Sequence, residues 1–270
     1  MKEFFIERYQ KLKPDFSPDN IVLKPSLRIN TLKMTHAKLK SRLAKEKVRL
    51  ERISFLKDGY YYDANFSLGA TPEYLMGYYY LQEAASQVVS ERLAPSGKDL
   101  VLDMCAAPGS KTTHLAQIMG NEGMLIALEK KRHRVPSLMN NLERMGVENT
   151  IVYNMDARDA PSLGKSFDKI LLDAPCSGNF VTDDAWFDKR DISSIRTNSR
   201  MQRQLLEVAA KIVKKGGLIL YSTCSMEPEE NEDVADWAIS ELRVKEKERR
   251  RFWPDVDGTQ GFFFSLLEKV

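Results

Sequence analysis

Residues 169–178 read Lys-Ile-Leu-Leu-Asp-Ala-Pro-Cys-Ser-Gly, and this stretch decides the fold. Its apolar run, 170–172, predicts a buried β-strand that ends at Asp173, with Cys176 three positions later. Open α/β sheets bind ligands beyond the carboxyl ends of their strands, so this position predicts a site. The alternative is a strand cap beside a small buried thiol, which is the usual role of an isolated Asp or Cys.

The composition is that of a globular protein. The chain has 270 residues, 43% of them hydrophobic, which is enough for one large domain or one and a half. It contains no run of eighteen apolar residues and no apolar block at its N-terminus, so we expect a cytoplasmic protein without a membrane span. Cys105, Cys176 and Cys224 are too few and too widely spaced for a disulfide framework or a structural zinc site. We therefore expect reduced thiols, no metal and a monomer.

The positive charge is concentrated at the front of the chain. Residues 1–57 hold fifteen Lys and Arg against six Asp and Glu, a net charge of +9, whereas the remaining 26 basic and 32 acidic residues give −6. A basic segment on a nearly neutral protein suits a polyanion such as nucleic acid. Solvated lysine-rich helices give the same pattern, so the charge alone leaves both interpretations open.

The first 75 residues predict a small α+β module. Leu27 and Ile29 alternate with Arg28, which indicates a half-exposed strand with Arg28 on its outer side. The order β-α-β-β is typical of a ferredoxin-like fold, whose sheet and basic helix could lie along phosphates. The predicted elements are a helix at 2–12, a strand at 26–33, a helix capped by Thr35 and running to about 45, and strands near 48–55 and 60–62.

Residues 76–270 predict a second domain. Its strands and helices alternate, which favours a doubly wound, mostly parallel sheet. A last strand at 261–269 could pair antiparallel at an edge. The other predicted strands lie near 99–104, 123–128, 150–154, 168–173 and 217–223, and the predicted helices at 81–93, 110–120, 131–145, 199–215 and 234–242.

Three of the predicted strands are followed by residues that suit a nucleoside ligand. After the first strand, residues 103–113 include several small residues and one glycine, Gly109, which allow a tight turn before a helix N-terminus. The pattern is neither Gly-x-Gly-x-x-Gly nor a Walker loop. Glu129 lies where an acid accepts hydrogen bonds from ribose hydroxyls, or it simply starts a helix. Asp156 could accept from an adenine amino group or belong to a turn.

Two thiols follow neighbouring strands of the predicted sheet. Cys176 comes just after the fourth strand and Cys224 just after the fifth, in the same half of the sheet. Core filling alone is a poor explanation for such a pair. A redox dithiol is a further alternative, but that role usually places both cysteines in one short motif.

The motifs together resemble the RNA (cytosine-5) methyltransferases of the Nop2/NSUN/RsmB family, in particular its archaeal-type tRNA members. The resemblance runs from about residue 67 to 264, with a further match at 28–33, Arg-Ile-Asn-Thr-Leu-Lys. One departure is Ser110, where many members have a second glycine. The matching motifs are Leu-Gln-Glu-Ala-Ala-Ser at 81–86, Asp-Met-Cys-Ala-Ala-Pro-Gly-Ser-Lys-Thr at 103–112, Asp-Ala-Pro-Cys-Ser-Gly at 173–178, and Ser-Thr-Cys-Ser at 222–225 followed by Glu227 and Asn231.

This resemblance implies a Rossmann-like methyltransferase sheet at 76–270 and an RNA-binding module at 1–75. It implies RNA as the partner, with tRNA as the expected substrate and ribosomal RNA as the alternative. It also implies S-adenosylmethionine as methyl donor, bound by Cys105, Ala106, Ala107, Pro108, Gly109, Ser110, Lys111, Glu129, Arg134, Asp156 and Asp173.

The resemblance further implies that Cys224 is the nucleophile and Cys176 its partner thiol. A thiolate that adds to cytosine C6 activates C5 for methylation, and a second group must then help remove the C5 proton. Asp173 suits hydrogen bonding to cytosine N3 or N4, and the charge of Lys111 would favour a thiolate. Two rivals are a methyltransferase for small molecules or proteins, which the paired thiols disfavour, and a non-catalytic RNA-binding scaffold.

Overall fold

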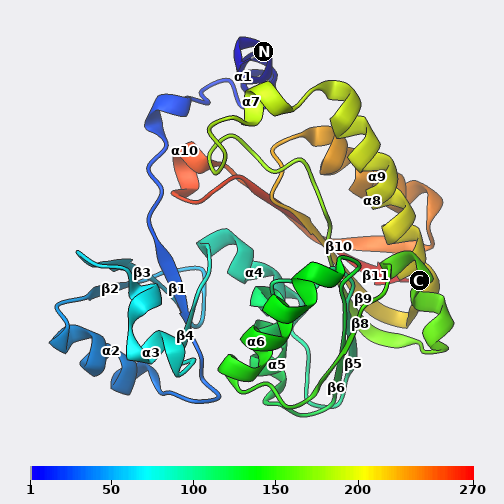
Figure 1. Cartoon of the computed structure of the whole chain (residues 1–270). Helices are drawn as coiled ribbons and strands as arrows, with labels where there is room; N and C mark the ends of the chain where they lie inside the picture. Colours follow the sequence, from blue (N-terminus) through cyan, green and yellow to red (C-terminus); the bar gives the residue numbers. More distant parts are fainter. Residues whose placement is uncertain (1) are drawn as a thin grey trace.

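The computed structural model describes residues 2–270 and contains two β-sheets, one of four strands and one of seven. Figure 1 shows the small sheet, in blue and cyan, beside the larger one. Within the described residues, no helix is both long and apolar enough to cross a membrane.

The small sheet has the predicted ferredoxin-like topology. Its strand order is β2-β3-β1-β4, and all neighbouring strands are antiparallel. The side chain of Thr35 accepts a hydrogen bond from the amide of Lys38, so Thr35 caps α2 as predicted. The elements are β1 (Ser26–Ile29), α2 (His36–Lys45), β2 (Arg49–Arg52), β3 (Gly59–Asp63), α3 (Pro72–Leu75) and β4 (Tyr79–Leu81).

The larger sheet has the order β10-β11-β9-β8-β5-β6-β7. The five strands β5 to β9 run parallel to one another, which confirms the predicted doubly wound sheet. An antiparallel pair, β11 and β10, extends it beyond β9. The strands are β5 (Leu100–Asp103), β6 (Met124–Leu128), β7 (Thr150–Tyr153), β8 (Phe167–Asp173), β9 (Val213–Thr223), β10 (Val244–Phe252) and β11 (Phe262–Lys269).

Helices cover both faces of this sheet, as Figure 1 shows. Apolar side chains of α8 and α9 pack on one face, and those of α4, α5 and α6 pack on the other. The helices are α4 (Ala84–Leu93), α5 (Ser110–Met119), α6 (Val135–Met145), α8 (Ile192–Ile212) and α9 (Glu232–Glu241), with α1 (Lys2–Leu12), α7 (Trp186–Lys189) and α10 (Pro254–Asp257) outside these layers.

Two strand predictions were wrong. Arg28 does not face solvent: its side chain is fully buried and donates to Gln82, to Gln117 and to Thr113 on α5. The last strand, β11, is not an edge strand, because β10 pairs along its outer side. The sequence of β10, Val-Lys-Glu-Lys-Glu-Arg-Arg-Arg-Phe, is charged at seven positions, as suits an edge strand, and it carries no apolar alternation.

The structure also differs from the predicted element bounds in the front part of the chain. Leu81, expected to begin a helix, ends β4, and α4 starts at Ala84. Because β4 pairs with β1, the small sheet extends past the expected boundary at residue 75. Conversely, α1 packs among loops of the larger part rather than on the small sheet.

Candidate active site

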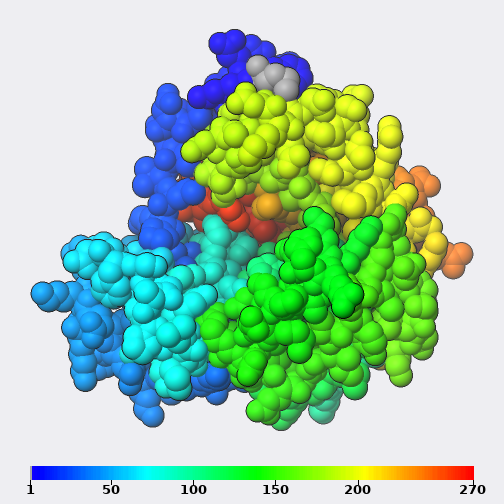
Figure 2. Space-filling model, in the orientation of Figure 1, coloured from blue at the N-terminus to red at the C-terminus, as the bar shows by residue number. Residues whose placement is uncertain are grey.

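The two loops that follow β8 and β9 bring the thiols together. These strands are parallel neighbours in register, with Asp173 opposite Ser222, so the chain leaves both strands at the same edge of the sheet. The sulfur atoms of Cys176 and Cys224 lie 3.3 Å apart, and both residues are half-buried. Figure 2 shows a hollow where the cyan, green and yellow parts of the surface meet, with orange and red atoms at its floor.

The two thiols differ in proton affinity. The hydrogen bond from Cys176 lowers the pKa of Cys224, and the positive charge of Lys111 lowers it as well, against the opposing effects of burial and of Asp173. The same hydrogen bond, together with burial, raises the pKa of Cys176 well above its ordinary value. Cys224 is therefore the thiol that ionises first, and Cys176 keeps its proton and donates it to the thiolate.

An ion pair lies beside the thiols. The ammonium nitrogen of Lys111 is 2.9 Å from Asp173 Oδ2, and Ser222 donates to Asp173 Oδ1 over 2.9 Å. Burial lowers the pKa of Lys111, but Asp173 and the Cys224 sulfur outweigh it and leave the pKa raised. Lys111 thus remains an ammonium, and it is a proton donor close to both the Asp173 carboxylate and the Cys224 sulfur.

Polar side chains that were not predicted tie the two loops together. Asn179 donates to the carbonyl of Cys224, and the hydroxyls of Ser177 and Ser225 lie 3.0 Å apart. The buried Glu230 accepts from the amide of Ser177. Ser177 and Ser225 belong to two of the matching motifs, but polar residues in turns carry no pattern that indicates such contacts.

A cavity of about 470 Å³ opens beyond the carboxyl ends of β5 and β6. Four of the predicted cofactor residues, Cys105, Glu129, Arg134 and Asp156, are among its lining residues. Apolar side chains from α8 close it on another side, which the sequence did not indicate. The full lining is Met104, Cys105, Glu129, Lys130, Lys131, Arg134, Asp156, Ala157, Arg158, Pro175, Met201 and Leu205.

The two acids of the cavity are held by basic neighbours. Glu129 accepts from the amide of Lys131 over 2.7 Å. Asp156 pairs with Arg158 over 2.7 Å and with Lys130 over 2.9 Å, and these hydrogen bonds hold the pKa of Asp156 far below its ordinary value. Asp156 is therefore an ionised acceptor at neutral pH.

The rest of the predicted cofactor loop does not line this cavity. Residues 106–109 form the turn into α5, and Gly109 has a φ of +104°, where a side chain would be strained. Ser110 begins α5 and does not have a positive φ, so the missing second glycine costs little, as expected. Lys111 and Asp173, which were predicted both to bind the cofactor and to act on the cytosine, lie beside the thiols instead.

Comparison with known proteins identifies the family. A family model described as 16S rRNA methyltransferase RsmB/F matches residues 90–268, and one described as the N-terminal domain of 16S rRNA methyltransferase RsmF matches residues 1–84. The chain belongs to the RsmB/F methyltransferase family. The resemblance drawn from the motifs is thereby confirmed.

Relatives of this RsmB/F chain modify different RNAs. A tRNA (cytosine(49)-C(5))-methyltransferase of Pyrococcus abyssi is 39% identical over 89% of this chain and 79% of that protein. A mouse 28S rRNA (cytosine-C(5))-methyltransferase is 35% identical over 99% of this chain. The structure of NSun6 from Pyrococcus horikoshii with SFG has a TM-score of 0.90 at 27% identity and covers 98% of this chain and 97% of that one.

The chain matches only part of the length of its mammalian relatives. It covers 38% of the mouse protein and 36% of a human 28S rRNA (cytosine(4447)-C(5))-methyltransferase. Fold and family therefore carry over, whereas activity and substrate have to be argued from the site.

Proposed function

We propose that this chain transfers a methyl group from S-adenosylmethionine to C5 of a cytosine in RNA, with Cys224 as the nucleophile. The observation that carries the proposal is the pair of thiols 3.3 Å apart, of which only one has a lowered pKa. Attack on C6 requires a thiolate, and the later removal of the C5 proton requires a second group at the same face of the ring. Cys224 and Cys176 meet these two needs.

The cavity suits the methyl donor. The carboxylate of Glu129 can accept from ribose hydroxyls, and that of Asp156 from an adenine amino group. Met201 and Leu205 offer apolar contacts to a purine face. When bound, S-adenosylmethionine supplies an electrophilic methyl group.

The chain's own groups can act in sequence on the cytosine. Cys224 forms the bond to C6, and the Lys111 ammonium, held by Asp173, can stabilise the electron density that develops on the ring. Once Cys224 is a thioether, the negative charge that raises the pKa of Cys176 is gone. Cys176 then ionises more easily, at the stage where a base must take the C5 proton so that elimination releases Cys224.

The test is transfer of tritium from labelled S-adenosylmethionine to RNA, with the modified cytosine located by bisulfite sequencing. We expect Cys224→Ala to abolish transfer, and Cys176→Ala to accumulate a covalent protein–RNA adduct on a denaturing gel. The double variant serves as control and should form no adduct. Normal turnover by Cys176→Ala would refute its role in release.

We propose tRNA as the substrate. The archaeal tRNA (cytosine(49)-C(5))-methyltransferase is 39% identical to this chain, compared with 35% for the mouse rRNA enzyme, and this likeness supports tRNA. Ribosomal RNA is the second candidate, because the match at residues 1–84 is to the N-terminal domain of a 16S rRNA methyltransferase. Parallel assays with unmodified tRNA and 16S rRNA decide between them.

A further inference from the structure

Helix α1 supplies two hydrogen-bond donors to the loop that carries Cys224. The hydroxyl of Tyr9 donates to Glu227 Oε1 over 2.6 Å, and the guanidinium of Arg8 lies 3.1 Å from Glu227 Oε2 and 2.8 Å from Glu229 Oε1. The Glu227 side chain is fully buried. Burial raises the pKa of Glu227, and the two donors oppose this effect. A buried carboxylate needs such partners, and here they come from the opposite end of the chain.

From Glu227 the hydrogen bonds continue to both thiol loops. The amide of Glu227 donates to the hydroxyl of Ser225 over 3.1 Å, and that hydroxyl lies 3.0 Å from the hydroxyl of Ser177. Ser225 directly follows Cys224, and Ser177 directly follows Cys176. A displacement of Glu227 would therefore move both sulfur atoms relative to each other.

The apolar side of α1 packs against the same loops. Tyr9 stacks on Phe180 with ring centroids 6.0 Å apart. Phe5 packs edge-on against Trp186 with ring centroids 4.8 Å apart. The indole nitrogen of Trp186 donates to the carbonyl of Ser177 over 2.9 Å. These side chains belong to one apolar cluster, which packs between helices and loops. Its buried members, none of which lies in a strand, are Phe5, Tyr9, Phe16, Trp186, Phe187, Ile195 and Met226.

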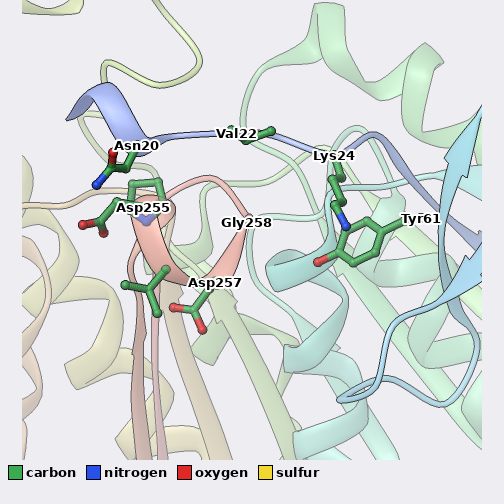
Figure 3. A pocket seen from close by; sticks show the side chains of 9 residues that line it. Asn20, Val22, Lys24, Tyr61, Asp255, Asp257 and Gly258 are labelled. Atoms are coloured by element: carbon green, nitrogen blue, oxygen red, sulfur yellow. The ribbon is translucent and has the colours of Figure 1, made fainter. Parts of the chain in front are cut away.

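A second anchor holds the segment that follows α1. Lys13 pairs with Asp255 of α10 over 2.9 Å, and the amide of Ser17 donates to the same carboxylate. Figure 3 shows the onward segment, with Val22 and Lys24, passing α10 on its way to the small sheet. Helix α1 is thus held to the larger part by Arg8 and Tyr9 and, just after its last residue, by Lys13; Figure 1 shows it beside α7.

We propose that α1 positions the nucleophile, with Tyr9 as the positioning residue that acts through Glu227 on the Cys224 turn. The inference rests on the proposed function but concerns a helix outside the methyl-donor cavity and the thiol loops. Its consequence is that the Cys176–Cys224 hydrogen bond, and with it the reactivity of Cys224, depends on the first helix of the chain.

The test compares Tyr9→Phe with Phe5→Leu in the full-length chain. Tyr9→Phe keeps the ring and removes only the hydroxyl, whereas Phe5→Leu weakens the same cluster and leaves the bond to Glu227 in place. We expect Tyr9→Phe to lower kcat about tenfold with an unchanged KM for RNA, because small misplacements of reacting groups are costly. We expect the Phe5→Leu protein to keep its kcat, although its Tm falls by as much as that of Tyr9→Phe or by more.

A second measurement needs no RNA. The rate at which iodoacetamide alkylates Cys224, followed by peptide mass spectrometry across pH, should shift to higher pH in Tyr9→Phe and stay unchanged in Phe5→Leu. The proposal would be overturned if Tyr9→Phe had the same alkylation profile and the same kcat as the wild type. It would also be overturned if both substitutions changed these two quantities equally. If the wild-type chain methylates no RNA, the proposed function fails, and the alkylation comparison still decides the role of Tyr9.

Discussion

The buried carboxyl of Asp103 should make the stability of the protein depend on pH. Asp103 ends β5 and is 1% exposed, and burial raises its pKa from 3.8 to about 7 despite hydrogen bonds from Thr112 and from the amide of Cys105. Between pH 4 and 7 the folded chain therefore holds a proton that the unfolded chain has released. The free energy of unfolding falls as pH rises through this window, by about 4 kcal/mol at 1.36 kcal/mol per pH unit.

Urea unfolding of the wild type and of Asp103→Asn between pH 4 and 8 measures this contribution. The amide cannot ionise, so subtracting the two curves cancels every other titrating group. We expect the wild type to lose about 4 kcal/mol relative to the variant over this range, with most of the loss complete by pH 7. A difference that stays constant within about 0.5 kcal/mol would show that Asp103 titrates normally and would refute the reasoning.

Two further substitutions test the packing between the two sheets, both by urea unfolding. Gly77 has a φ of +70°, and a Cβ there would lie 1.9 Å from the carbonyl oxygen of Arg144, so Gly77→Ala should cost more than about 3 kcal/mol. Gly164→Ala, at a φ of +60° with open space around it, is the matched control and should cost about 1 kcal/mol. Arg28→Met should cost about 3 kcal/mol, because it leaves the buried Gln117 without its donor; a loss under 1 kcal/mol would contradict that account.

The alternation of strands and helices could be predicted because it depends on local patterns of apolar residues in the sequence. The apolar run 170–172 is buried, as its pattern predicts, and parallel strands bring their carboxyl ends to one edge. That rule alone placed Asp173, Cys176 and Cys224 near one another, and the structure brings them together. Of the four predicted residues that line the cavity, Cys105, Glu129 and Asp156 followed from the same rule, whereas Arg134 was implied by the family resemblance.

The errors arise where a distant segment changes the environment of a residue. Arg28 alternates with apolar neighbours, as an exposed residue does, but α5 covers that face and offers Thr113 and Gln117 as acceptors. Strand β10 is charged along its length, and only its pairing with β11 makes it a strand. No periodicity of α1 indicates that its partner is Glu227, more than two hundred residues away.

The assignment of separate roles to two chemically identical thiols depends on this same long-range context. Both sulfur atoms lie in half-buried loops, so burial alone would raise both pKa values. The hydrogen bond between them lowers the pKa of Cys224 and raises that of Cys176. Glu230 raises both pKa values, and Lys111 lowers that of Cys224. With one proton shared between them, the hydrogen bond leaves it on Cys176, and the Lys111 ammonium favours the negative charge on Cys224. The difference between the two thiols therefore depends on Lys111, which belongs to α5, as well as on the two loops that carry the sulfur atoms.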